Sequence, residues 1–434
     1  MISDSGIFYH EHPKELWTPK IIPARALPMA VRFKTWICDA QGRKLRVGNE
    51  GWNTITDWGM DSLATINQAI LASNLHLSTS LGTGKRVLSG GTTLSITSTA
   101  DPTNVSVVAS ANFFLSGDVG NTLYIDGLGQ ELKIVAFTDA QHVTCATRPS
   151  VWLPGITPST GPFSTAGVHF TSIATLAADF QAISTFDTSA SQNNAEISDY
   201  TNTRFIHQRI WLSGAFGTGQ TIQQVGWSNN TTIGGNCFGK INLTTPDTVN
   251  AGQKYRLQLQ LFCGYTPINL SSVPINWGAT IGSYSLNIRT EELRFDWSGS
   301  STNDSSQGSN SGCFLIPTGT PSGTSTNWFT SAFSLVGPYF WGDPSYNSGP
   351  HYPPAGSSGT NDLSYAAYST GTFMKSATWK ISDTLSISGA TGFVMGGTGN
   401  QCLSFAPAGG TITKPSGYYA SLIFPIYWTR QLLN

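Results

Sequence analysis

The sequence contains few charged residues. Lys and Arg number 23 and Asp and Glu number 24, so 11% of its 434 residues are charged, against about 25% in an ordinary soluble chain. With a formal net charge of -1 it has no basic excess to neutralise nucleic-acid phosphates, so the composition argues against a nucleic-acid partner. A surface of hydroxyl and amide groups is typical of proteins that face the outside of a cell.

Long apolar runs are also lacking. No stretch of about 18 apolar residues occurs, so the sequence predicts no membrane span. The first residues hold no apolar segment of the kind that a secretory signal needs. The six cysteines are scattered without a CxxC pair or a Cys/His cluster at zinc spacing, so we expect reduced, mostly buried thiols. These absences predict a product made in a cytoplasm and exposed later, such as a virion component released by lysis.

Aromatic and turn-forming residues, by contrast, are plentiful. The 13 Trp, 14 Tyr and 22 Phe, within a hydrophobic fraction of 39%, exclude a disordered chain. The 46 Gly and 22 Pro divide the sequence into short segments bounded by turns. The length is sufficient for several domains or for one large β domain.

Alternation of apolar and polar residues predicts antiparallel strands. Residues Val31 to Asp39 alternate in this way, and a turn at Gln41–Gly42 lets them pair with Lys44 to Val47 as a hairpin. Residues Tyr255 to Cys263 place apolar side chains on one face and mostly polar ones on the other, as in a half-buried strand. The sequence therefore predicts a mainly β fold of antiparallel β-sandwich domains, jelly-roll-like in type.

One segment has the period of a helix. Between Asp57 and Ala72 the apolar residues from Met60 to Leu71 fall on one face, and either Thr56 or Asp57 can cap the first turn. We expect this amphipathic helix to be the single long helix of the chain.

Shifts in composition divide the chain into six segments. We expect an extended docking arm at residues 1–27, a β-hairpin and helix region at 28–103, a small β module at 104–148, a Pro-, Gly-, Ser- and Thr-rich linker at 149–167, a β-sandwich at 168–300 and a C-terminal β region with aromatic loops at 301–434. The arm is expected to be extended because Pro13, Pro19 and Pro23 interrupt any regular period.

Two segments resemble motifs of enzymes but are better explained as turns and strands. Gly234 to Lys240 matches the first seven positions of a phosphate-binding loop, but Ile241 stands where Ser or Thr would bind magnesium, and strand patterns flank both sides. Glu292 and Asp296 lie about 13 Å apart along a strand, whereas glycosidase carboxylates need roughly 5 to 9.5 Å. The sequence therefore predicts a protein that is not an enzyme and uses no cofactor.

His10 and His12 form a weak candidate for a metal site. Flanking Glu11, they lie on the same side of an extended chain, and three symmetry-related copies would offer six nitrogens to a transition metal. The alternative is an exposed arm without metal. We favour the arm, since His ligands need supporting hydrogen bonds that a Pro-rich segment does not readily supply.

Aromatic residues gather in a segment rich in Gly, Pro and Asn. Their rings and the neighbouring amides could stack on sugars and form hydrogen bonds to them, although core or subunit packing is the commoner use of such rings. The candidates for binding a receptor or glycan are Trp328, Tyr339, Trp341, Tyr346 and Tyr352.

Three stretches together resemble structural proteins of tailed bacteriophages. They are the hairpin around Gly42 with Trp52 to Thr56 and the following helix, Leu77 to Gly84 with its Gly82-Thr83-Gly84 turn, and Arg204 to Tyr265, in which Thr221 to Trp227 precedes one strand and Val249 to Tyr255 opens another. In such proteins a hairpin, a helix, a short GTG turn and a β-sandwich follow in this order. Val105 to Thr147 also resembles small β modules of tail fibres and tail spikes.

The resemblance implies a non-enzymatic virion protein of the tail, fibre or collar apparatus, made in the bacterial cytoplasm and located in the virion. Its partners would be other virion proteins and further copies of itself, most plausibly as a homotrimer, since closed symmetry is the usual route to such assemblies. The alternatives are a protein that binds a receptor or host-surface glycan through its C-terminal aromatic loops, or a capsid decoration protein. A polysaccharide-degrading tailspike ranks last.

Overall fold

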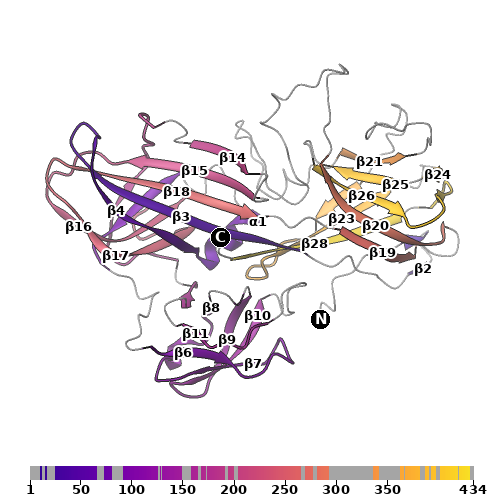
Figure 1. The fold of residues 1–434 in the computed structure, drawn as a ribbon, viewed down its shortest axis with the longest axis horizontal. Coiled ribbons are helices and arrows are strands. Elements are labelled where there is room, and N and C mark those ends of the chain that lie inside the picture. The colour runs from indigo at the N-terminus through magenta and orange to yellow at the C-terminus, as the bar shows by residue number, and fades with distance from the viewer. Residues whose placement is uncertain are drawn as a thin grey trace. The chain divides into compact units, whose positions relative to one another are not determined.

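A computed structural model provides the fold (Figure 1). It describes residues 10–11, 15–16, 25–65, 73–80, 91–125, 128, 130–148, 158–164, 168–172, 174–190, 194–199, 204–264, 269–276, 281–292, 336–341, 362–365, 367–381, 387–390, 392–396, 401–418 and 420–430. The protein is mainly β with antiparallel sheets, as the sequence predicts. The jelly-roll connection pattern stays a prediction.

The chain forms two compact units. One comprises Met1–Arg25, Tyr265–Tyr368 and Met374–Tyr427, and the other comprises Ala26–Gly264, Ser369–Phe373 and Trp428–Asn434. We call them the 265–427 unit and the 26–264 unit and describe each by itself.

In the main sheet of the 26–264 unit, nine strands pair in the order β13-β5-β16-β17-β4-β3-β18-β15-β14. Their bounds are β3 (Arg25–Cys38), β4 (Lys44–Ile55), β5 (Asn74–Ser78), β13 (Asp179–Ile183), β14 (Asn194–Asp199), β15 (Arg204–Leu212), β16 (Gln220–Ser228), β17 (Gly239–Val249) and β18 (Lys254–Gly264). The predicted hairpin is confirmed as β3 and β4, which pair antiparallel across the turn at Gly42.

This sheet folds over itself into two layers. The carboxylate of Asp247 on β17 accepts a hydrogen bond from Tyr255 of β18 at 2.9 Å, although β18 lies three strands away in the sheet order. Asp247 also accepts hydrogen bonds from Thr35 at 2.8 Å and from Asn49 at 3.1 Å. Burial, followed by the charge of Asp247, raises the pKa of Tyr255 well above its usual value, so the phenol remains a donor. A buried polar cluster therefore joins the facing layers.

Alternation along β18 sets which side chains enter the core. Tyr255, Leu257 and Leu259 are at most 1% exposed, whereas Gln258 and Gln260 between them are half-buried. Side chains of a strand point alternately to its two faces, so the apolar set packs between the layers and the glutamines lie on the outer face. The predicted half-buried strand is confirmed.

A small β module is inserted into this unit. Its seven strands run in the order β11-β6-β7-β10-β9-β8-β12. They are β6 (Thr93–Ile96), β7 (Val105–Ala109), β8 (Thr122–Ile125), β9 (Glu131–Phe137), β10 (His142–Arg148), β11 (Phe163–Ser164) and β12 (Val168–Phe170), with a short 3-10 helix, η1 (Ser116–Asp118), after β7. Ser78 of β5 and Asp179 of β13 are paired, so the module leaves and rejoins the main sheet at neighbouring positions. Apolar side chains from all seven strands form its own buried core.

The helix α1 (Asp57–Thr65) follows β4. Thr56 caps it, because its hydroxyl oxygen accepts a hydrogen bond from the backbone N–H of Gly59 at 3.0 Å. The expected continuation to Ala72 lies outside the described residues. Among those residues α1 is the sole α-helix, and no helix there has the length and apolarity needed to span a lipid bilayer.

The 265–427 unit contains a five-stranded sheet in the order β19-β20-β26-β25-β21. Its strands are β19 (Asn269–Asn276), β20 (Ser283–Glu292), β21 (Val336–Trp341), β25 (Gly392–Gly396) and β26 (Gln401–Pro407). Three further groups of paired strands are β1 (His10–Glu11) with β2 (Glu15–Leu16), β24 (Ile387–Ala390) with β27 (Ile412–Lys414), and β23 (Met374–Ile381) between β22 (Asp362–Tyr365) and β28 (Ala420–Arg430). The last residues of β28, from Trp428 on, belong to the 26–264 unit.

The structure groups several stretches differently from the sequence-based segments. The hairpin and helix region 28–103 shares one sheet with most of the expected sandwich, whereas β19 and β20, also from 168–300, lie in the other unit. The module also includes β6, β11 and β12, which lie outside residues 104–148, and β11 lies within the expected linker. These differences arise because strands that are far apart in the sequence pair with one another. No local sequence pattern indicates such pairing.

Candidate functional site: a polar face on strands β3, β4 and β18

The outer face of the β4-β3-β18 sheet carries most of the polar side chains that we consider as a site. The register places Lys34 opposite Glu50 of β4 and Gln258 of β18. It likewise places Arg32 opposite Trp52 and Gln260. Two rows of side chains therefore cross three strands, and we call these six residues the polar face.

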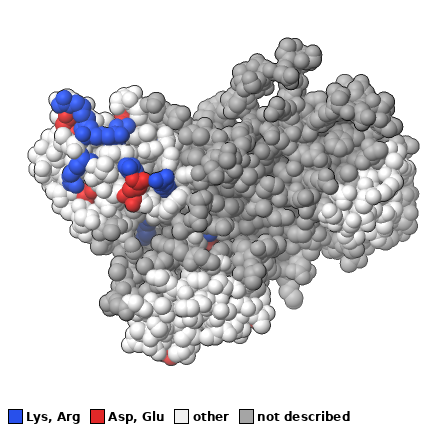
Figure 2. All heavy atoms as spheres, viewed as in Figure 1, with Lys and Arg blue, Asp and Glu red and all other residues white. Residues whose placement is uncertain are grey.

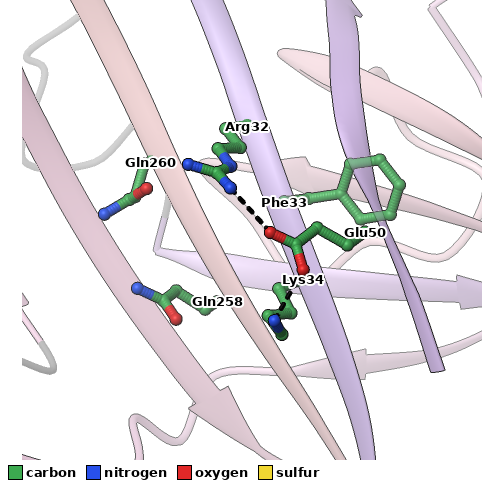
Figure 3. Close-up of a pocket in the computed structure, with 6 residues that line it drawn as sticks. All are labelled: Arg32, Phe33, Lys34, Glu50, Gln258 and Gln260. Carbon is green, nitrogen blue, oxygen red and sulfur yellow. Dashed lines mark hydrogen bonds and ion pairs between the residues drawn. The ribbon is translucent and has the colours of Figure 1, made fainter. Parts of the chain in front are cut away.

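A hollow of about 200 Å³ opens on this face (Figure 3). It is lined by Arg32, Phe33, Lys34, Glu50, Gln258 and Gln260. In Figure 3 the side chains of Arg32 and Lys34 turn toward Glu50, while the two glutamines extend from the neighbouring strand. Phe33, which pairs with Gly51 in the register, is the apolar residue of the lining.

Glu50 is paired with two cations. Its carboxylate lies 2.7 Å from the Arg32 guanidinium and 2.5 Å from the Lys34 ammonium. The hydrogen bonds from Lys34 and Arg32 lower the pKa of Glu50, so the carboxylate is charged at neutral pH. All three side chains are at least one-third exposed, and exposed ion pairs contribute about 0.2–1 kcal/mol. These pairs can therefore rearrange at small cost when a ligand binds.

The two glutamines are held in a fixed orientation by a third. The amide nitrogens of Gln258 and Gln260 donate to the buried Oε1 of Gln208 on β15, at 2.7 and 2.9 Å. Because only the NH₂ group of an amide can donate, this contact fixes which end of each glutamine points inward. Each carbonyl oxygen remains an acceptor on the open side of the strand.

Two tryptophans lie on strands β3 and β4 beside residues that line the hollow. Trp52 packs against Phe262 with ring centroids 5.2 Å apart and is still 38% exposed. Further along β3, the Trp36 ring lies beneath the ammonium of Lys44 at 4.5 Å and the guanidinium of Arg256 at 5.5 Å. Arg256 is in turn paired with the buried carboxylate of Asp187 at 2.8 Å.

Charge is concentrated on this side of the molecule. Figure 2 shows blue and red side chains gathered where β3, β4 and β18 lie in Figure 1, while the remaining described surface in that view is almost entirely uncharged. In a chain with 11% charged residues, this concentration distinguishes the polar face from the rest of the described surface.

A second charged cluster is buried and joins three segments of the 26–264 unit. Asp57 of α1 forms ion pairs with Arg430 at 2.8 Å and with Arg148 of β10 at 3.1 Å. Arg430 also pairs with Glu131 of β9 at 2.5 Å. Hydroxyl groups of the module complete the shell of Asp57, with Thr171 at 2.6 Å. We call Asp57, Glu131, Arg148 and Arg430 the ionic cluster.

The two carboxylates of the ionic cluster respond differently to burial. Burial raises the pKa of Asp57, but the charges of Arg430 and Arg148 outweigh it and leave the pKa below its usual value. Burial raises the pKa of Glu131 more than the attraction of Arg430 lowers it. This arrangement is closed by protein groups and locks the module to α1, so we assign it a structural role.

A third buried pair joins His76 of β5 to Asp179 of β13. The His76 Nδ1 lies 2.9 Å from the Asp179 carboxylate, and its Nε2 lies 2.9 Å from the carbonyl oxygen of Asn230. Both neighbours are acceptors, so both ring nitrogens must donate. Burial lowers the pKa of His76, but the hydrogen bonds that His76 donates to Asp179 and Asn230 outweigh it and raise the pKa overall.

Of the residues nominated from sequence for glycan or metal binding, the structure describes Tyr339, Trp341 and His10. Tyr339 and Trp341 lie two residues apart on β21, the edge strand of the five-stranded sheet. Trp328, Tyr346 and Tyr352 lie outside the described residues. His10 is in β1, where it pairs with Leu16, and His12 lies outside the described part.

The structure also describes parts of the two enzyme-like motifs and three of the cysteines. Gly234 lies in the turn between β16 and β17, which confirms a Gly-rich turn flanked by strands. Glu292 ends β20, and Asp296 lies outside the described residues. Within the described ranges no group of three or more His, Cys, Asp or Glu residues is placed to hold a metal ion. Cys38, Cys145 and Cys237 are buried free thiols, as expected.

Sequence reasoning missed Arg32, Lys34, Glu50 and Gln260 as members of one site. The alternation along β18 indicates an outward glutamine row, but nothing local indicates that β3 is its neighbour, since Gln260 and Arg32 are more than 200 residues apart. The fold and this face define a mainly β protein with a charged, amide-rich surface on one sheet. No protein-family model matches the chain, and comparison with curated proteins and with solved structures gives no match.

Proposed function

We propose that the chain is a structural protein of a tailed bacteriophage particle, belonging to the tail, fibre or collar apparatus and acting in particle assembly. The observation that carries the proposal is the order of elements in the 26–264 unit. The hairpin β3–β4, the helix α1 and the strands β16 and β18 occur along the chain in the order named in the resemblance, whose Gly82–Gly84 turn lies outside the described residues.

The ionic cluster supports an architectural role. It ties an inserted module, a helix and the last residues of β28 to one another through charges that are at most 16% exposed. Removing one partner of a buried ion pair is strongly destabilising, because the other charge is left buried without a counter-charge. Such a cluster therefore holds its segments in one arrangement. A fixed arrangement of modules is what a repeated particle component needs.

The proposal is tested on particles from the bacterium that encodes the chain. Lysis is induced, tailed particles are banded on a density gradient, and the bands are probed with an antibody to the chain and by peptide mass spectrometry. We expect the chain to band with the particles and to stay there after a high-salt wash. Recovery of the chain only at the top of the gradient, with a known tail protein in the band as control, would overturn the proposal.

A further inference from the structure

We propose that the polar face binds a glycan that carries carboxylate groups, with the sugar seated in the hollow between β3, β4 and β18. This inference does not rest on the place of the chain in a virion, and it assigns a site far in sequence from the aromatic segment after residue 327.

The lining of the hollow suits hydroxyl groups. A sugar ring offers many hydroxyls that both donate and accept, and proteins recognise such ligands with a few fixed polar groups. Gln258 and Gln260 are held by Gln208 with their amide nitrogens turned toward it, so their acceptors are in place before a ligand arrives. Glu50 adds a charged acceptor on the opposite side.

Trp52 supplies a platform for the apolar face of a sugar. One side of the indole rests on Phe262, and the residue is 38% exposed. In the register it lies directly opposite Arg32, a residue that lines the hollow. An exposed aromatic ring beside hydrogen-bonding groups matches a ligand with one apolar and one polar surface.

The charge of the face favours an acidic ligand. Arg32 and Lys34 contribute two positive charges to the face, against the single carboxylate of Glu50. Arg32 presents a planar fork that can bind a carboxylate through two parallel hydrogen bonds. Its contact with Glu50 is half exposed, so a ligand carboxylate can take part of that place. A neutral glycan would form no ion pair with these positive charges.

The experiment uses the intact chain and an array of bacterial surface polysaccharides, with carboxylated and neutral members and a sulfated glycosaminoglycan as a test of charge alone. Three variants address the face: Trp52→Ala, Gln258→Ala and Arg32→Lys, of which the last keeps the charge but loses the planar fork. The matched control is Lys133→Ala on β9, an exposed lysine of the inserted module. Thermal unfolding of each variant is compared with that of the unaltered chain.

We expect binding to carboxylated members, at least tenfold weaker in each face variant and unchanged in Lys133→Ala. Equal binding to neutral members would overturn the acidic specificity. Binding that the face variants do not change, or binding that follows sulfate alone, would overturn the site. If no polysaccharide binds and the face variants instead lose their retention on purified particles, the face contacts a protein partner and the inference is wrong.

Discussion

At the scale of single residues, the molecule depends on buried charges that are fully surrounded. Asp57 receives hydrogen bonds from Thr122 at 2.8 Å and Thr171 at 2.6 Å in addition to its two arginines. Its side chain is 15% exposed, so the contacts act in a weakly screened environment. By contrast, Glu50 also pairs with two cations but is 37% exposed. The same chemistry should therefore have different energetic weight at the two positions.

The substitution Asp57→Ala tests this difference. It leaves Arg148 and Arg430 without a shared counter-charge, so we expect the free energy of unfolding to fall by about 3–5 kcal/mol. The matched control Glu50→Ala should cost no more than about 1 kcal/mol. Both are measured by urea unfolding with tryptophan fluorescence. Similar losses for the two variants would contradict a structural role for the ionic cluster.

His76 makes a separate prediction about pH. Its pKa is raised above the ordinary value of 6.5 by the Asp179 and Asn230 contacts, which outweigh the effect of burial. A group with a raised folded pKa stabilises fully below its unfolded pKa, and the stabilisation is lost as the pH rises through the folded pKa. We therefore expect the unfolding free energy of the intact chain to decline above about pH 6.5.

The decline should be smaller in His76→Gln, measured across about pH 6 to 9. The control is His142→Gln, because His142 also faces an aspartate, Asp139, but is 45% exposed. A pH slope that is the same in His76→Gln and in the unaltered chain would show that the ring is not the titrating group.

At the scale of elements, β4 is the strand that allows the sheet to fold over. Its early residues pair with β3, and its last residues, Thr54 and Ile55, pair with β17 of the other layer. Within the part that pairs with β3, the register shifts between Val47 and Glu50, and Gly48 there lies beside the Asp247 cluster. There a side chain would lie 2.3 Å from the Thr35 hydroxyl and 2.4 Å from the Asp247 carboxylate.

The substitution Gly48→Ala should therefore push apart the polar cluster between the layers. We expect a loss of about 1–3 kcal/mol of stability, as for other overpacked cores. Gly51→Ala on the same strand is the control, since its added carbon would lie 3.4 Å from Phe33, an ordinary contact. Differential scanning calorimetry compares the two. A Gly48 variant as stable as the Gly51 variant would contradict the packing described.

Local sequence patterns predicted the individual strands and the helix better than they predicted which strands lie side by side. The hairpin, the start of α1 and the two faces of β18 follow from turn chemistry and alternation, which are properties of adjacent residues. The sequence left open whether Thr56 or Asp57 caps α1. Thr56 does so, and Asp57 instead binds arginines 91 and 373 residues away. The polar face escaped prediction for the same reason, since its two rows come from strands that are distant in the sequence.

At the scale of the whole molecule, the chain consists of two units built from antiparallel sheets. A two-layered sheet carries an inserted module with its own core, and a separate unit carries a five-stranded sheet. Sheets with unpaired edges offer sites for pairing with another chain unless they are covered. This organisation supports the expectation of a homo-oligomer, which for closed symmetry we expect to be a trimer.

Light scattering on the purified chain tests that expectation. A trimer of the 46.4 kDa chain has a mass of about 140 kDa under closed three-fold symmetry. The number of chains in the oligomer should stay the same over a tenfold dilution, with and without residues 1–27, if the oligomer forms outside the docking arm. A mass of one chain at every concentration would reject the trimer.

The central claim is that this chain is a particle component with its polar face accessible. The most direct measurement is immunogold electron microscopy of gradient-purified particles, using an antibody to the exposed turn at residues 39–43, which joins β3 and β4. The account predicts gold at one fixed location of the tail apparatus on most particles. Unlabelled particles, with strong labelling of the isolated chain by the same antibody and no chain detected in dissociated particles, would contradict it.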